Sequence, residues 1–441
     1  MPRWWGGHGL RGGGRRVAGA GALRLRGDAG RAGAGGGRCR ARPHLRLGVH
    51  PGVGPGGGHR LHDLALPPRG GLLRAHQGRG PARRGGGRRR HRAAAAHPVS
   101  DAGAMMPGVT STSPDLPMTT RVSGVGSWPG ESPREAVRAV RDLLGDGVPH
   151  LPELPGRGVG ADMVGRAASL LEGLHVETQP FGWRLVDRPG RDEGRAAAHL
   201  RHDLDELAEA YDGWQGPLKL QVSGPWTLAA TLELTRGERV VSDHGARRDL
   251  TESLAEGLRT HVAEVARLVP GADLVVQVDE PAVPAVLEGR LPTQSGYGRL
   301  RAVDRSEVRD SLRVVLHAAG DHRTVVHCCA AEVPVTLLHE AGADGLSLDM
   351  TLLDGSRWEQ LAAAVEGGAH LWAGAVRVGA DWRTAHDRLT GAWGRIGLTT
   401  ASLADVVVTP TCGLAGATPT SAVATLRTAK DLAEALAESG R

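Results

Sequence analysis

The chain reads Thr324-Val-Val-His327-Cys328-Cys329 near the middle of its second half, and this stretch ends an apolar run on a His-x-Cys pair. A second run, Val406-Val-Val-Thr-Pro-Thr-Cys412, ends on another cysteine much later. Near-continuous Val-rich runs are typical of strands buried on both faces, as in a parallel sheet. Alternation along the first strand places His327 and Cys329 on one face and Cys328 on the other.

The pattern on both sides of this stretch alternates short apolar strands with amphipathic helices. Strands are expected at 121–127, 150–153, 217–223, 273–279, 323–328, 344–349, 369–375 and 404–409. Helices are expected at 132–144, 162–172, 200–213, from Trp226 onward, and at 247–268, 304–319, 332–341, 356–366, 382–395 and 420–438. The stretch 176–195 is left ambiguous around one strand at 183–186. About eight such units favour a (β/α)₈ TIM barrel over an open sheet. Gly124-Val-Gly126 lacks a third glycine in register, so a dinucleotide fold is disfavoured.

Chemically useful residues fall at the carboxyl ends of the expected strands. They are Ser127, Glu153, Gly224, Asp279, Cys329, Asp349 and Cys412. This is the face on which barrel enzymes build their active sites, because the loops after the strands converge there.

A zinc site is the first expectation at this face. One imidazole from His327 and two thiolates from Cys329 and Cys412 form a donor set that suits Zn²⁺. Small buried cysteines and a histidine bonded to a carbonyl would be the purely structural alternative. Asp349 is a candidate fourth ligand, with a helix cap or an outer-shell partner as its alternative.

Substrate contacts are expected from four further residues. Asp279, in Gln277-Val-Asp279-Glu280-Pro281, could bind an ammonium group, and Glu153, between two prolines, is a second candidate or a plain loop charge. The segment around Ser127 could offer backbone N–H groups to a carboxylate. Trp226 could stack on a flat ring or simply pack in the core.

The first 117 residues differ from the rest of the chain. They contain 21 Arg, no Glu and 4 Asp, a net charge of +17, whereas residues 118–441 carry a net charge of −11. Segments so rich in glycine and charge cannot bury enough apolar surface to fold, so we expect disorder in 1–117 and one domain over 118–441. Three interpretations of this leader are open: an RNA-binding tail, a targeting peptide, or upstream DNA translated ahead of a true start at Met118. The third is favoured.

The motifs together resemble the catalytic barrel of the cobalamin-independent methionine synthases. Gly126-Ser127-Trp128-Pro129 is similar to the family's Gly-Ser-Phe-Pro, and Gln277-Val-Asp279-Glu280-Pro281-Ala282 to its Gln-Ile-Asp-Glu-Pro-Ala. His327-x-Cys329 matches the family's His-x-Cys, and Cys412-Gly413-Leu414 its Cys-Gly-Leu. The resemblance covers most of 121–430, in a form with a single barrel.

The resemblance implies a thiol methyltransferase. His327, Cys329 and Cys412 would bind Zn²⁺, with Asp349 where the family has a glutamate ligand. Ser127, Glu153 and Asp279 would bind the amino-acid end of homocysteine.

The resemblance also implies that the homocysteine sulfur takes the methyl group of methyltetrahydrofolate to give methionine. The segment Gly374-Ala-Val-Arg377 lacks the family's proton-donating histidine, and Trp226 lies earlier in its helix than the family's stacking tryptophan. The residue that protonates the leaving group is therefore not assigned.

Three other expectations complete the interpretation. A methyl-corrinoid or another donor could replace methyltetrahydrofolate, and a non-enzymatic protein with a structural zinc is the alternative of another class. The acidic domain gives no reason to expect a nucleic-acid partner. Clustered free cysteines and the lack of a long apolar run or secretory signal indicate a cytoplasmic protein without a membrane segment.

Overall fold

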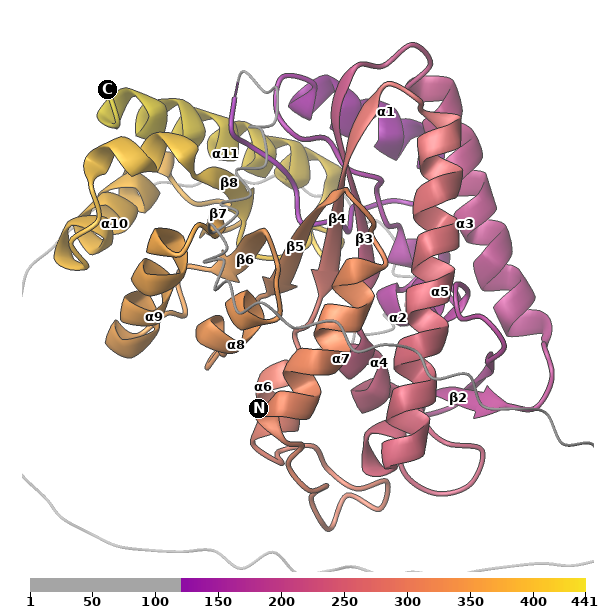
Figure 1. The fold of residues 1–441 in the computed structure, drawn as a ribbon. Coiled ribbons are helices and arrows are strands. Elements are labelled where there is room, and N and C mark those ends of the chain that lie inside the picture. Colours follow the sequence, from indigo (N-terminus) through magenta and orange to yellow (C-terminus); the bar gives the residue numbers. More distant parts are fainter. Residues whose placement is uncertain (1–119) are drawn as a thin grey trace, which may run out of the picture. The chain divides into compact units, whose positions relative to one another are not determined.

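The structure is a computed structural model, and it describes residues 120–441. The leader and Met118 lie outside the described residues, so the expectations for them stay predictions. The described part is an α/β fold with a curled parallel sheet at its centre and helices around it (Figure 1).

The central sheet contains six parallel strands in the order of the sequence. They are β3 (Gly216–Ser223), β4 (Ala272–Asp279), β5 (Arg323–Cys328), β6 (Gly345–Asp349), β7 (His370–Val376) and β8 (Val407–Pro410). Nearly every residue of these strands is buried, as their Val- and Leu-rich sequences predict. Their sequential order follows from the helical crossovers that parallel neighbours require.

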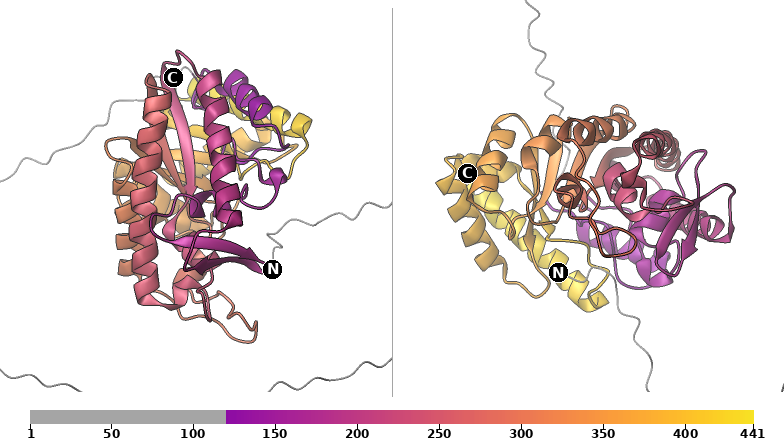
Figure 2. Two further views of the ribbon diagram at one scale, coloured as in Figure 1. Left: turned by 90° about the vertical axis from the view of Figure 1, so that its right-hand side faces the viewer. Right: turned by 90° about the horizontal axis from the view of Figure 1, so that it is seen from below.

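Helices connect and cover these strands. They are α1 (Pro133–Leu144), α2 (Met163–Ala168), α3 (Arg191–Ala210), α4 (Pro225–Thr231), α5 (His244–Leu268), α6 (Val283–Leu287), α7 (Arg305–His317), α8 (Val335–Glu340), α9 (Gly355–Glu366), α10 (Trp382–Arg395) and α11 (Pro419–Ser439). Short 3₁₀ turns are η1 (Pro155–Arg157), η2 (Val240–Ser242) and η3 (Thr400–Asp405). The long helices α3 and α5 run along one side of the sheet, and α10 and α11 along the other (Figures 1 and 2).

Two extended segments near the start of the described chain join the edges of the sheet. Val122 bridges Val408 of β8, and Ser123 bridges Val148. His150 in turn bridges Lys219 of β3. Strands were expected at 121–127 and 150–153, but these segments form only isolated β-bridges and no continuous β-ladder.

The region between these segments and β3 differs most from expectation. Residues 175–186 form an antiparallel hairpin of β1 (His175–Gln179) and β2 (Gly182–Val186), where one strand was expected. The following helix α3 begins at Arg191, nine residues before the expected start at 200. Asp192 and Glu193 in its first turn favour this start, because carboxylates stabilise helix N-termini.

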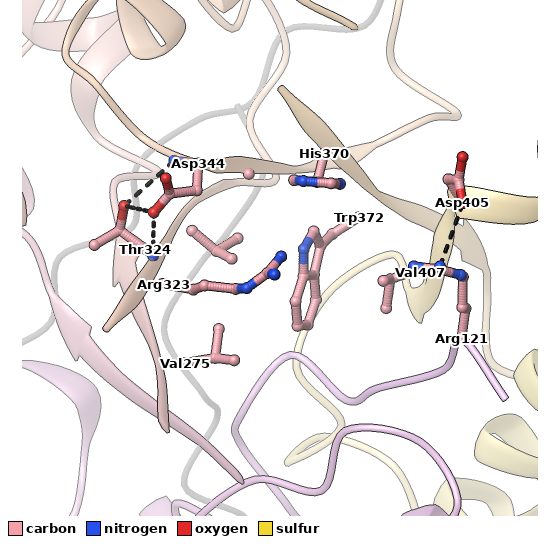
Figure 3. Close-up of a pocket in the computed structure, with 11 residues that line it drawn as sticks. Arg121, Val275, Arg323, Thr324, Asp344, His370, Trp372, Asp405 and Val407 are labelled. Carbon is pink, nitrogen blue, oxygen red and sulfur yellow. Dashed lines mark hydrogen bonds and ion pairs between the residues drawn. The ribbon is translucent and has the colours of Figure 1, made fainter. Parts of the chain in front are cut away.

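A small cavity lies at the amino-terminal end of the sheet (Figure 3). The first residues of four strands line it, among them Arg323, Gly345 and His370. Beside it Arg121 pairs with Asp405 at 3.3 Å, and the Asp344 carboxylate accepts from Thr324. The expected functional residues follow the opposite ends of the strands, so this cavity is separate from them.

Candidate metal and substrate site

Three expected metal ligands meet at the carboxyl end of the sheet. Ligand atoms of His327, Cys329 and Cys412 all lie within 4.8 Å of one another. His327 is the second-last residue of β5 and Cys329 directly follows this strand, whereas Cys412 comes from the loop after β8, which the curl of the sheet brings opposite. His327 and Cys329 are buried and Cys412 is half-buried. Cys328 is fully buried in the core, as alternation predicts.

The histidine is oriented as a metal ligand usually is. Its Nδ1 lies 3.0 Å from the Ser347 hydroxyl on β6, the next strand. Its Nε2 is buried and has no hydrogen-bond partner among the described residues. A buried polar atom without a partner costs free energy, so an ion bound at this nitrogen would be favourable. A hydroxyl that holds the other ring nitrogen is typical of metal-bound histidines.

The two cysteines lie within hydrogen-bond distance of each other. Their sulfur atoms are 3.3 Å apart, and either thiol can be the donor. This hydrogen bond lowers the pKa of Cys412 and raises the pKa of Cys329. The backbone N–H of Gly413 also lowers the pKa of Cys412. One thiolate therefore forms readily, and the N-S-S donor set with the free Nε2 fits Zn²⁺.

Asp349 lies at the end of β6, outside this group of three. Its Oδ1 accepts from the backbone N–H of Thr351 at 2.9 Å and from the Thr351 hydroxyl at 2.6 Å. Arg377 donates to the same hydroxyl at 2.6 Å. Asp349 thus caps the turn after β6 in this structure, and its role as a fourth ligand stays a prediction.

Asp279 and Glu153 are both buried carboxylates beside the metal-binding group. Asp279 pairs in register with His327 across β4 and β5. Burial raises the pKa of Asp279, partly offset by His327 and Lys219. Burial also raises the pKa of Glu153 to about 7, although Arg166 at 3.5 Å acts against it. A cationic group bound beside these two carboxylates would therefore stabilise their charged forms.

Ser127 links the substrate side of the site to the loop of Cys412. Its backbone bridges Glu153, and its carbonyl accepts from Leu414 N–H at 2.9 Å. A Cβ added to Gly413 would lie 2.1 Å from the Ser127 hydroxyl, so the two segments could not keep this approach unless the Ser127 side chain or the loop moved. The three residues expected to bind the amino-acid end of a substrate thus surround the metal-binding group.

Trp226 lies in the core, which is one of the two alternatives that the sequence left open for it. The indole is 1 % exposed, and its N–H donates to the carbonyl of Val308 in α7 at 2.9 Å. With both faces covered by the core, it has no surface on which a flat ring could stack. Glu280 holds the same turn, accepting from the backbone N–H groups of Trp226 and Thr227.

Several polar residues beneath the site were not predicted. Lys219 of β3 and Gln277 of β4 are fully buried, and Arg166 of α2 contacts Glu153. A lysine inside the apolar run Pro217-Leu-Lys-Leu-Gln-Val is a signal that could have identified the first of these. Arg166 carries no such signal, because its partners Glu153 and Asp203 are distant in sequence.

Comparison with known proteins places most of the chain in one family. Residues 117–435 match the family described as "Cobalamin-independent synthase, Catalytic domain". One similar solved structure is a B12-independent methionine synthase from Shewanella sp. W3-18-1 in complex with selenomethionine, at 15 % identity and a TM-score of 0.48. The match covers 74 % of this chain and 98 % of that chain. Among curated proteins the search found no match. In residues 120–441 no helix is both long and apolar enough to cross a membrane.

Proposed function

The chain belongs to the cobalamin-independent synthase family, whose catalytic domain it matches, and from this premise we propose that it transfers a methyl group to the sulfur of homocysteine to give methionine. The observation that carries the proposal is the convergence of His327, Cys329 and Cys412 beside two buried carboxylates. In a substrate that carries a thiol and an ammonium group, the thiol matches the metal-binding group and the ammonium matches the two carboxylates.

We infer that residues 122–127 and 148–153 complete a (β/α)₈ barrel with the six strands of the sheet. Single bridges to β8 and β3 at its two edges support this. The site would then occupy the mouth of the barrel, where enzymes of this architecture act.

His327, Cys329 and Cys412 would hold Zn²⁺, with Asp349 as a candidate fourth ligand. When bound, the ion would lower the pKa of a coordinating thiol, so that the homocysteine sulfur would be a thiolate at neutral pH. Ser347 keeps the His327 ring turned so that Nε2 remains free for this role.

Asp279 and Glu153 would bind the homocysteine ammonium, and the segment at Ser127 its carboxylate. A buried carboxylate gives a charge-assisted hydrogen bond that fixes the substrate with its sulfur toward the metal site. Such positioning accounts for much of the rate of a displacement at a methyl carbon. The thiolate takes the methyl group from its donor, and the donor keeps the electron pair of the broken bond.

We propose methyltetrahydrofolate as the donor, as the family resemblance implies. The leaving N5 atom would then accept a proton. The buried position of Trp226 removes one expected folate contact, so a methyl-corrinoid is a second donor to be tested.

The test supplies the zinc-loaded chain with homocysteine and either methyltetrahydrofolate or methylcobalamin, and measures methionine. X-ray absorption of the same sample should gain a Zn–S distance when homocysteine is added, because a catalytic site keeps an open position. Methionine from one donor only would identify that donor. No methionine from either, together with an unchanged zinc spectrum, would refute the proposed function and indicate a closed structural zinc site.

A further inference from the structure

Lys219 is an unusual residue for its position. It lies on β3 in the interior of the sheet, with no exposed side-chain surface. It is one of only two lysines among the 54 Lys and Arg residues of the chain. The other, Lys430, lies on α11 and pairs with Asp146 at 2.5 Å in a half-buried position. A buried ammonium is costly, so a specific use is expected for it.

The contacts of Lys219 lead through the side chain of Gln277 to the carboxylate of Asp279. Its Nζ donates to the carbonyl of Val125 at 2.7 Å and to Oε1 of Gln277 at 2.8 Å. Because Oε1 faces the lysine, Nε2 of Gln277 faces the other way and donates to Asp279 Oδ1 at 2.7 Å. Lys219 thus supplies the donor to Oε1 that completes the orientation of this amide. Without Lys219, Oε1 would be a buried acceptor that has lost its donor.

The second contact holds the strand segment that carries Ser127. The Val125 carbonyl accepts from both Lys219 and Gln277 Nε2, the latter at 2.8 Å. Lys219 therefore joins β3, β4 and the segment at 125–127 beneath the site.

The charge of Lys219 also faces both carboxylates of the site. Burial lowers the pKa of Lys219 to about 7, and the negative charges of Asp279 and Glu153 act to raise it. A neutral amine still has two N–H bonds, enough for both hydrogen bonds. The orienting contacts thus persist in either charge state.

We propose that Lys219 is a positioning residue for the amino group of the thiol substrate. It fixes the Gln277 amide so that the Asp279 carboxylate is oriented toward the ammonium. This rests on the proposed function, in which Asp279 binds that ammonium.

The test replaces Lys219 by Met, which keeps the length of the side chain and removes the donors. Lys430→Met is the matched control, with the same chemical change far from the site. Steady-state kinetics are measured with homocysteine and with 4-mercaptobutyrate, which has the same thiol and carboxylate but no amino group. Zinc content and the unfolding midpoint are recorded for each zinc-loaded full-length variant.

For K219M the KM for homocysteine should rise at least about tenfold, with kcat within about threefold, since ground-state positioning of one group is lost. Its kcat/KM for 4-mercaptobutyrate and its zinc content should stay within about twofold of the parent. K430M should match the parent on both thiols. Equal losses of K219M on both thiols, or an unchanged KM for homocysteine, would overturn the proposal.

Gln277→Met provides an independent measurement, which decides the matter if K219M does not fold. Q277M should show the same selective rise in the KM for homocysteine. In the double variant, K219M should raise this KM by less than about a further threefold, because the effects of two residues that act in series are not additive. Equal losses of Q277M on both thiols, or full additivity, would contradict the proposal. If the unchanged chain methylates homocysteine, such results refute the role of Lys219 alone. If it does not, the proposed function falls first and the role of Lys219 with it.

Discussion

At the residue scale, the contact between two sulfur atoms determines what the site can bind. The sulfur atoms of Cys329 and Cys412 lie 3.3 Å apart, and the His327 side chain, whose Nε2 has no hydrogen-bond partner among the described residues, is close by. Cys328, next in sequence to one of them, faces the core and takes no part. Two neighbouring cysteines therefore have different roles, because adjacent residues of a strand point to opposite faces.

We predict that Cys412→Ser abolishes zinc retention and turnover. A serine hydroxyl keeps its proton at neutral pH, so the site loses its thiolate ligand. Zinc affinity should fall by at least about 100-fold, since even outer-shell partners are worth roughly 10- to 100-fold. Metal analysis after dialysis measures this. Cys328→Ala is the control and should keep its zinc; full activity of C412S would show that Cys412 is not a ligand.

The raised pKa of Glu153 makes a prediction about stability and pH. Burial raises this pKa from 4.5 to about 7, so the native state holds a proton that the unfolded state releases. The stabilisation is fully present below pH 4.5 and is lost as the pH rises to about 7, a change of about 3 kcal/mol. Urea unfolding of the metal-free chain across this range should show the loss. Glu153→Gln should reduce it, and identical pH profiles for the two chains would contradict the prediction.

At the scale of elements, the loop after β8 and the segment at Ser127 must fit against each other to place Cys412. Leu414 N–H donates to the Ser127 carbonyl, and Gly413 leaves room for the Ser127 hydroxyl. Neither segment belongs to a helix or to a ladder of the sheet. Close backbone contact takes the place of secondary structure here.

We predict that Gly413→Ala lowers turnover by at least about tenfold, because displacements near 1 Å can cost about 100-fold. The new Cβ would meet the Ser127 hydroxyl at 2.1 Å and push the loop of Cys412 outward. Gly416→Ala, where a Cβ meets nothing within 4 Å, is the matched control. Kinetic assays and zinc analysis of both variants test this. Equal behaviour of the two would mean that the loop adapts.

At the scale of the whole molecule, the two parts of the chain have opposite charge. The first 117 residues carry +17 and the remainder −11. We predict that a chain starting at Met118 keeps its zinc and its methyl transfer within about twofold, because every site residue lies after it. Its isoelectric point should move from the basic to the acidic side. Isoelectric focusing and the methionine assay measure both effects, and loss of turnover would assign the leader a role.

The sequence predicted the parts of the site that depend on strand ends. His327, Cys329 and Asp279 follow or end buried strands, and parallel strands bring such ends to one edge. It left open whether Trp226 stacks on a ligand or packs in the core, because its burial depends on α7, far along the chain. Of the β1–β2 hairpin only the strand around 183–186 was expected, and β1 was missed because its half-buried residues lack a clear alternation. The role of Lys219 depends on three segments meeting in space, which no local pattern records.

The position of Cys412 has a consequence for biosynthesis. His327 and Cys329 leave the ribosome well before the strand that precedes Cys412, and that strand must dock beside β7 to bring its sulfur across. An unfinished or prematurely released polypeptide thus has only two of the three donors. Only polypeptides that have been fully translated and have docked β8 would therefore bind the metal ion with all three donors.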